Sequence, residues 1–421
     1  NSFFEKGVFT SCKKTDKCPP WKMRAQKIQH DKANKQIIYN NAWLELYDFP
    51  VAYFPKFFHP DPSVKRQSGL MKPEIGDHNT LGDSIYLPYF LVLSDEIDMT
   101  IKPRLFNDNK IILQSEYRQK TKNSRTIIDF SITKGHSSNI NDQKDSRSHF
   151  FSNTKVDLGL ENFIDSQIEI NYKSVSNDNY LQLFDFMLSP LLGNTNVLES
   201  EIKLDLANVN YDLIGSFEMY ETLSGANSDR YQYVLPSYIF SKNFDLEKVN
   251  GSFNFNSSGN NTLKNTNITT SSVSNSLNFD STSFFFDQGI KTNFEVLLKN
   301  MNSMGKNSTQ FKNSPQSELM SAYIYNASLP LKKSNLNSIN TFEPKLSLRI
   351  SPHDMKNNKN ESRRIDANNV FNSDRLSLGN SFESGESITL GLNFKKEKTN
   401  IKNKIFEIDE YFDLKLATVF R

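Results

Sequence analysis

The sequence has little tryptophan, little cysteine and no long apolar run. Of its 421 residues only 2 are Trp and 2 are Cys, and the mean hydropathy is −0.58. No run of about 18 apolar residues occurs, which excludes a membrane protein built from transmembrane helices. Lys and Arg number 50 against 48 Asp and Glu. The chain therefore lacks the basic excess with which a dedicated nucleic-acid binder neutralises phosphates.

Motifs for catalysis and metal binding are missing as well. The sequence contains no nucleophile elbow, no phosphate loop and no cluster with metal-ligand spacing. His59 and Asp61 lie near each other but have no further partners at a suitable spacing. We therefore expect no enzyme activity, no cofactor and no metal.

The two cysteines, Cys12 and Cys18, are followed directly by Pro19 and Pro20. They are either free thiols or, in an oxidising compartment, a disulfide, and their spacing does not decide between these states. A metal site is disfavoured because no second pair of Cys or His follows at ligand spacing.

The sequence is rich in aromatic residues that favour strands, with 33 Phe and 16 Tyr. Apolar and polar residues alternate strictly over 168–172 and 202–206, a period typical of strands with one apolar face. From residue 81 onward the pattern predicts long strands, and one turn of helix within 179–188. Loops rich in Asn, Ser and Lys are expected at residues 135–147, 256–276 and 300–317. This favours a large transmembrane β-barrel, with a soluble Asn-rich adhesin as the alternative.

Residues 21–58 predict shorter strands with tight turns. Repeats of about 20 residues per strand pair are typical of the end of a β-jellyroll, which is too small here to bury a core alone. One strand of this region is expected to place Ala42, Leu44 and Leu46 on one face, opposite Trp43, Glu45 and Tyr47.

Several short motifs occur along the chain. They are FTSC at 9–12, PWKMRA at 20–25, PVAYFPKF at 50–57, KRQSGL at 65–70, YLPYF at 86–90 and TIKPR at 100–104, with weaker ones at 174–180, 184–185 and 369–371 with Arg375. Together they resemble the LptD family (also called OstA or Imp) of outer-membrane lipopolysaccharide-assembly proteins. The resemblance is strong through about residue 106 and patchy in the loops.

The resemblance implies an all-β protein in three parts. These are the C-terminal part of a periplasmic β-jellyroll (1–62), a hinge (63–80) and an incomplete, large antiparallel transmembrane β-barrel (81–421). At roughly 20–25 residues per strand and connection, the last part would supply about 14–17 strands, fewer than the family's barrel. We therefore expect a fragment that lacks the N-terminal start and the last barrel strands. The family commonly pairs a cysteine like Cys12 with cysteines late in the barrel, and none follows Cys18. The alternatives are a local Cys12–Cys18 disulfide and a partner beyond Arg421.

The function implied by the resemblance is transport of lipopolysaccharide into the outer leaflet of the outer membrane. The lipid would pass from a jellyroll groove through a lateral gate in the barrel. Pro88 and Pro103 are the expected gate residues because proline cannot donate to a strand ladder, although each could simply mark an edge or bulge. The expected groove lining, for which an ordinary sandwich core is the alternative, is Ala42, Leu44, Leu46, Val51 and Tyr53.

The joint between the two architectures is rich in proline and followed by two basic residues. Pro60 and Pro62 restrict the turning chain. Lys65 and Arg66 are expected near anionic headgroups or lipid A phosphates, and a solvated basic turn at the membrane surface is the alternative.

The resemblance also implies a location and partners. The barrel would lie in the outer membrane of a Gram-negative bacterium, with the N-terminal part in the periplasm. Lipopolysaccharide, outer-membrane lipids, a plug lipoprotein (LptE-like) in the lumen and an LptA-like periplasmic jellyroll bridge are the expected partners, and nucleic acid is not. A passive porin is the alternative, but it has no use for a jellyroll or for prolines in its first strands.

Overall fold

The computed structural model describes residues 2–10, 21–61, 63–64, 66–78, 81–107, 110–134, 146–184, 189–224, 229–245, 249–335, 338–354, 364–376, 378, 381–402 and 405–421. Regular structure in these residues is almost entirely β-strand, which confirms the all-β prediction. Their one helix, α1 (Tyr180–Leu183), lies where a helical turn was predicted. No helix in the described part of the chain is long and apolar enough to cross a membrane.

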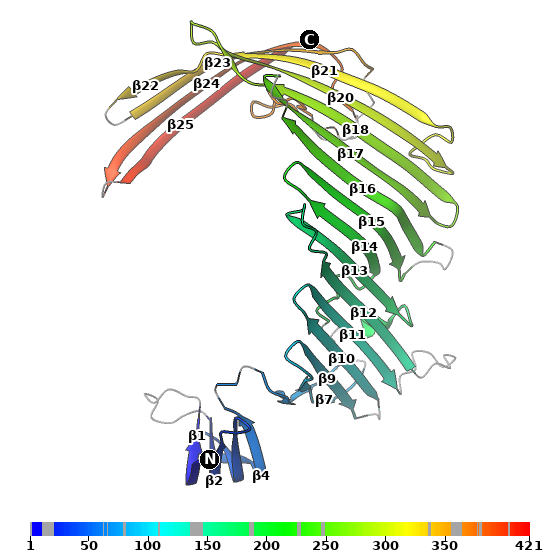
Figure 1. Ribbon diagram of the computed structural model, residues 1–421, viewed down its shortest axis with the longest axis vertical. Coiled ribbons are helices and arrows are strands. Elements are labelled where there is room, and N and C mark those ends of the chain that lie inside the picture. The colour runs from blue at the N-terminus through cyan, green and yellow to red at the C-terminus, as the bar shows by residue number, and fades with distance from the viewer. Residues whose placement is uncertain are drawn as a thin grey trace. The chain divides into compact units, whose positions relative to one another are not determined.

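Contacts divide the chain into two units, residues 1–153 with 174–192 and residues 154–173 with 193–421. The first unit begins with a four-stranded antiparallel sheet in the order β1-β2-β3-β4 (Figure 1). Its strands are β1 (Ser2–Phe9), β2 (Trp21–Asp31), β3 (Gln36–Leu46) and β4 (Phe49–Pro60). Met23, Ala25, Ile28, Tyr39 and Ala42 form the buried core of this sheet.

The remaining strands of the first unit form an antiparallel sheet. They are β5 (Gly69–Leu70), β6 (Glu74–Gly76), β7 (Ser84–Tyr86), β8 (Tyr89–Val92), β9 (Ile97–Phe106), β10 (Ile111–Lys120), β11 (Ser124–Lys134) and most of β12 (Ser146–Asp157). β9, β10 and β11 pair in sequence over nearly their whole lengths, because the connections between them are short.

The second unit is one run of antiparallel strands that follow each other side by side (Figure 1). They are β13 (Asp165–Val175), β14 (Val197–Ala207), β15 (Tyr211–Thr222), β16 (Tyr231–Asp245), β17 (Gly251–Lys264), β18 (Ile268–Ser281), β19 (Phe284–Phe285), β20 (Lys291–Lys306), β21 (Gln316–Ser328), β22 (Leu331–Asn335), β23 (Ser338–Ser351), β24 (Gly385–Lys402) and β25 (Ile405–Phe420).

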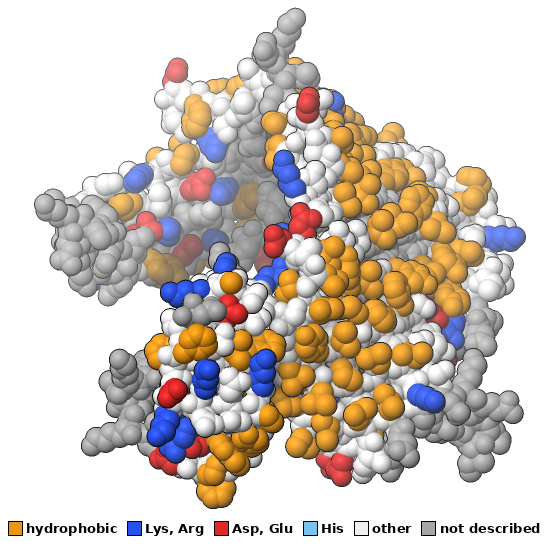
Figure 2. Space-filling model, turned by 60° about the horizontal axis from the view of Figure 1, so that its bottom comes forward, with side chains coloured by type: hydrophobic (Ala, Val, Ile, Leu, Met, Phe, Trp, Pro, Cys, Tyr) orange, Lys and Arg blue, Asp and Glu red, His pale blue; other side chains and the backbone are white. Residues whose placement is uncertain are grey.

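In β11 and β23 the usual burial pattern is inverted, with polar side chains covered and apolar ones exposed. In β23, Ser347 and Arg349 are 6% and 5% exposed, whereas the intervening Leu348 is 38% exposed. In β11, Asp129 and Ser131 are buried while Ile132 is 55% exposed. Figure 2 shows many hydrophobic side chains gathered on the surface of the protein. An apolar outer face with a polar opposite face is the pattern of a strand that faces lipid.

The prediction of a loop over residues 256–276 is wrong. These residues belong to β17 and β18, joined by a tight turn in which Asn265 and Thr266 have positive φ. Their Asn and Ser side chains form hydrogen bonds with each other across the strands. For example, Ser257 Oγ donates to Asn275 Oδ1 at 2.7 Å. Low hydrophobicity indicated a loop, but a strand with one polar face needs few apolar residues. The loop expected at 300–317 is likewise shorter, since β20 extends to Lys306 and β21 begins at Gln316.

Candidate functional site

In the second sheet of the first unit, the strand made by β7 and β8 is interrupted. β7 and β8 pair with β9 in one continuous register, in which Tyr86 is opposite Arg104 and Tyr89 is opposite Ile101. Continued across the break between β7 and β8, this register places Leu87 opposite Pro103 and Pro88 opposite Lys102. We use the name seam for this interrupted strand (residues 84–92) together with the two segments that pair with it (residues 69–76 and 97–106).

Pro103 removes one hydrogen bond from the side of the seam that faces β9. Leu87 N–H donates to Pro103 O at 3.1 Å. In an antiparallel ladder such a residue pair normally exchanges two bonds, and the return bond is impossible because proline has no N–H. Pro103 still occupies β9, where it is opposite Leu113 of β10.

Pro88 removes one hydrogen bond from the other side of the same strand. Met71 N–H donates to Pro88 O at 2.8 Å, and Pro88 cannot return the bond. Both prolines were predicted inside strands. Pro103 is, whereas Pro88 lies in the break between β7 and β8, because the missing donor ends the ladder there. The structure thus brings the two predicted gate residues to one interruption.

The segment predicted as a hinge pairs with the outer edge of the interrupted strand. Gly69 and Leu70 pair with Phe90 and Tyr89, and residues 74–76 pair with 84–86. Arg66 fixes the start of this segment, since its Nη1 donates to Asp95 O at 2.8 Å and its Nη2 contacts the Asp98 carboxylate. Pro60 ends β4, while Pro62 and Lys65 lie outside the described residues.

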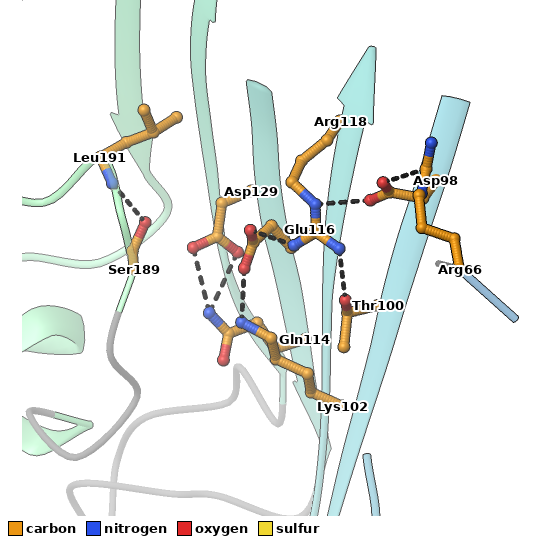
Figure 3. Close-up of polar contacts among 10 residues, drawn as sticks. All are labelled: Arg66, Asp98, Thr100, Lys102, Gln114, Glu116, Arg118, Asp129, Ser189 and Leu191. Atoms are coloured by element: carbon orange, nitrogen blue, oxygen red, sulfur yellow. Dashed lines mark hydrogen bonds and ion pairs between the residues drawn. The ribbon is translucent and has the colours of Figure 1, made fainter. Parts of the chain in front are cut away.

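A chain of charged side chains runs from this anchor across β9 and β10 (Figure 3). Arg118 contacts Asp98 and Glu116, and its Nη2 donates to Thr100 Oγ1 at 2.9 Å. Lys102 Nζ lies 2.8 Å from Glu116 Oε2. Three cations and two carboxylates therefore compensate one another on the polar face beside the seam. Sequence reasoning missed this network, although charges at alternate positions of successive strands were its signal.

The polar face continues into a buried cluster on β11 and β12. His149 Nε2 lies 3.4 Å from Asp129 Oδ1, and His149 Nδ1 lies 3.0 Å from Ser131 Oγ. The residue types are those of a hydrolytic triad, but Ser131 is 2% exposed and also contacts the hydroxyl of Tyr180. Because substrate cannot reach Ser131, the cluster serves to hold the loop that carries α1 against these strands. No group of His, Cys, Asp and Glu in the described ranges is arranged to hold a metal.

The five predicted groove residues do not share one environment. Ala42 is fully buried, and Leu44 packs against the same core cluster with Phe54 and Phe57. Tyr53 is 46% exposed and its ring lies 5.0 Å from that of Trp43, so it belongs to the opposite face.

Two backbone irregularities change which side chains of β3 and β4 are buried. Asn41 adopts a positive φ of 50°, which allows both Tyr39 and Ala42 to be buried although they are three residues apart. A bulge opposite Leu44 and Glu45 leaves Val51 without a paired residue on β3. Val51 and Leu46 are 48% and 44% exposed.

The end of the first sheet is held by side chains at the joint. Asp61 contacts the ring of His30 and accepts the Ser63 N–H at 2.8 Å. The hydrogen bonds from Ser63, together with His30, lower the pKa of Asp61 to about 2. His59 Nε2 lies 2.7 Å from the Tyr39 hydroxyl, whose pKa is raised by burial. His59 and Asp61 thus both have structural partners. The two cysteines, Cys12 and Cys18, lie outside the described residues.

Comparison with known proteins gives one family and several relatives. The model of the family LPS transport system D (LptD) matches residues 145–421. The LPS-assembly protein LptD of Legionella pneumophila strain Paris is 26% identical over 272 residues, which cover 60% of this chain and 31% of that protein. The LPS-assembly protein LptD of Pseudomonas aeruginosa strain UCBPP-PA14 is 28% identical over 185 residues, 42% of this chain and 19% of its own length. The chain thus spans a third or less of these relatives.

Proposed function

This chain belongs to the LPS transport system D (LptD) family, whose members are transport and assembly proteins rather than enzymes, and we propose that it guides lipopolysaccharide into the outer leaflet of the outer membrane. In this proposal the long strands lie in the outer membrane and the first sheet lies in the periplasm. The inverted burial of β11 and β23 supports the membrane location, because exposed Ile and Leu gain from contact with lipid.

The observation that carries a lateral exit is the loss of one hydrogen bond on each edge of the interrupted strand. A backbone bond contributes about 0.5–1.5 kcal/mol net, so two missing bonds weaken the seam by about 1–3 kcal/mol. Pro88 affects the edge toward residues 69–76, and Pro103 affects the edge toward β9. A strand weakened on both edges separates from its neighbours at a lower cost than any fully paired strand of the sheet.

The acyl chains would approach along the first sheet. Leu44 and Phe57 are partly buried and pack against its apolar cluster, in which Ala42 is fully buried. Leu46 and Val51 are exposed near the hairpin that joins β3 to β4, whereas Tyr53 lies on the face of Trp43. An LptA-like jellyroll bridge would deliver lipid to this face, and an LptE-like plug lipoprotein would contact the polar strand face. The joint with Arg66 would then direct the lipid to the seam.

The double substitution Pro88→Ala and Pro103→Ala in the full-length protein tests the lateral exit. The proposal predicts less lipopolysaccharide at the cell surface, because both restored donors tighten the seam. Pro344→Ala is the matched control, since Pro344 also lies in a paired strand and accepts a bond from Leu329 N–H at 3.1 Å, but far along the chain from the seam. Normal surface lipopolysaccharide in the correctly assembled double variant would favour a passive porin instead.

A further inference from the structure

The turns at one end of strands β12 to β20 expose large apolar side chains. Because neighbouring strands run antiparallel, alternate connections lie at the same end of these strands (Figure 1). At this end Ile164, Val209 and Phe285 are 75%, 79% and 69% exposed. Turns in contact with water are ordinarily built from Gly, Pro, Asn, Asp and Ser. We use the name turn rim for the described residues of these connections, which are 158–164, 208–210, 249–250 and 282–290.

The turn rim is one continuous surface, because backbone hydrogen bonds link its neighbouring turns. These bonds run from Ile164 N–H to Ala207 O at 2.8 Å, from Asn243 N–H to Asn210 O at 3.0 Å and from Thr282 N–H to Asn250 O at 2.9 Å. The rings of Phe163 and Tyr211 also meet edge to face, with centroids 5.9 Å apart. The exposed apolar side chains therefore belong to one extended patch, which is typical of a surface that contacts a partner or a membrane.

The hairpin at residues 282–290 is apolar on both of its sides. Its strand β19 pairs with the first two residues of β20, and Phe286 N–H donates to Ile290 O at 3.0 Å. Successive side chains of a strand point to opposite sides. Phe284 is exposed on one side, and Phe285 is exposed on the other. A protein partner would cover one side of this hairpin, whereas fluid lipid surrounds both.

The hairpin continues the strand face that the proposed function places in lipid. The rings of Phe284 and Phe294 are parallel within 2°, with centroids 6.5 Å apart. Phe294 is opposite Tyr325, which is opposite Leu348, and residues opposite each other in a sheet share one face. Leu348 lies on the exposed apolar face of β23. The hairpin therefore extends that apolar face toward the turns.

The turn rim has acidic side chains but no basic ones. Its charged residues are Glu161 and Asp287. Lys and Arg near a membrane attract anionic lipids, and the turn rim lacks this attraction. The lipid that suits it is therefore zwitterionic, with acyl chains to contact Val209 and Phe285 and no net charge on its headgroup.

We propose that the turn rim binds a zwitterionic lipid surface and inserts Val209, Phe285 and Phe286 at the boundary between headgroups and acyl chains. The connections at the opposite end, between β13 and β14 and between β23 and β24, are much longer. Short turns face the periplasm in outer-membrane barrels, so the lipid is that of the periplasmic leaflet. This inference rests on the membrane location in the proposed function, and it adds a site that anchors the strand ends through their turns.

Fluorescence quenching in the full-length protein tests the anchor. A fluorescent amino acid is placed singly at position 202, 209, 285 or 310, and the protein is reconstituted in phosphatidylcholine vesicles. The quenchers are phosphatidylcholine brominated on the upper part of its acyl chains and iodide on both sides of the membrane. We expect lipid quenching at positions 209 and 285 to exceed that at position 310 several-fold, and iodide quenching to show the reverse order. Gln310 is the matched control, because it is an exposed residue of the connection between β20 and β21 at the opposite end.

Position 202 separates this proposal from the membrane location itself, since Ile202 lies within β14 and is 52% exposed. Lipid quenching at position 202, with iodide quenching at 209 and 285 equal to that at 310, would overturn the anchor and leave the membrane location intact. Absence of lipid quenching at position 202 would overturn both. Protection of position 285 from both quenchers would indicate a protein surface, such as a second copy of this chain, and would also overturn the anchor.

The headgroup preference has its own measurement. Phosphatidylglycerol brominated in the same way should quench a fluorophore at position 285 no more than phosphatidylcholine does, because the turn rim has no basic side chain to attract it. Preferential quenching by phosphatidylglycerol would overturn the zwitterionic preference.

Discussion

Leu87 and Pro103 are opposite each other across the seam and share one backbone hydrogen bond where two are normal. The Leu87 amide is satisfied, and the Leu87 carbonyl cannot receive a bond from Pro103. At this pair the junction between β9 and the interrupted strand lacks one backbone hydrogen bond.

Substitution Pro103→Ala should stabilise this junction locally. A new Ala N–H at position 103 can donate to Leu87 O and add about 0.5–1.5 kcal/mol, so exchange of the Leu87 amide should slow by a few-fold to about tenfold. Hydrogen–deuterium exchange of the seam peptides measures this change. Pro344→Ala should leave the seam peptides unaffected, and exchange at Leu87 that is unchanged by Pro103→Ala would show that the missing donor does not limit opening.

The charge network beside the seam should matter more than an exposed ion pair. Arg118→Ala leaves Asp98 and Glu116 only partly compensated at 16% and 12% side-chain exposure, so we expect a loss of about 1–3 kcal/mol. Lys155→Ala removes an exposed partner of Glu169 and should cost less than about 1 kcal/mol. Denaturant midpoints of the detergent-solubilised protein compare the two, and equal losses would contradict a structural role for the network.

Acid should loosen the joint through Asp61. The folded-state pKa of Asp61 is about 2, below its ordinary value of 3.8. Its contribution to stability is therefore complete above pH of about 4 and is lost as the pH falls through about 2. Asp61→Asn should remove this part of the pH dependence, which unfolding measured between about pH 2 and pH 5 reports. Parallel curves for the native protein and the variant would show that the carboxylate does not hold the joint.

The two faces of the first sheet should differ in their contact with lipid. A photocrosslinking residue at position 44 is expected to capture lipopolysaccharide, because Leu44 borders the apolar cluster. The same residue at position 53 should capture little, because Tyr53 lies on the face of Trp43. Equal capture at both positions in the full-length protein would remove the groove from the proposal.

The sequence was informative where one residue decides the structure and uninformative where distant residues meet. Alternation in residues 168–172 predicts a strand because side chains alternate between faces every residue. Pro88 and Pro103 could be singled out because the missing donor is a property of proline itself. Their placement at one interruption depends on strand register, which no local pattern specifies.

Other features depend on contacts that composition hides. The Asn- and Ser-rich residues 256–276 looked like a loop because pairing between Ser257 and Asn275 is invisible in one strand alone. The contact of Ser131 with Tyr180 joins residues 49 positions apart. The burial of both Tyr39 and Ala42 depends on the positive φ of Asn41, which local alternation does not reveal.

The most direct test of a lateral exit is to lock the seam reversibly. Leu70 and Tyr89 face each other on its outer edge, one rung from Met71 and Pro88. Such a pair that does not exchange hydrogen bonds has Cα atoms about 4.5 Å apart, within the range of a disulfide. In full-length protein carrying Leu70→Cys and Tyr89→Cys, surface display of lipopolysaccharide should stop on oxidation and recover with reductant. The pair Ile202→Cys and Phe217→Cys, across β14 and β15, should have no such effect. Undiminished display with the seam disulfide fully formed would contradict the account.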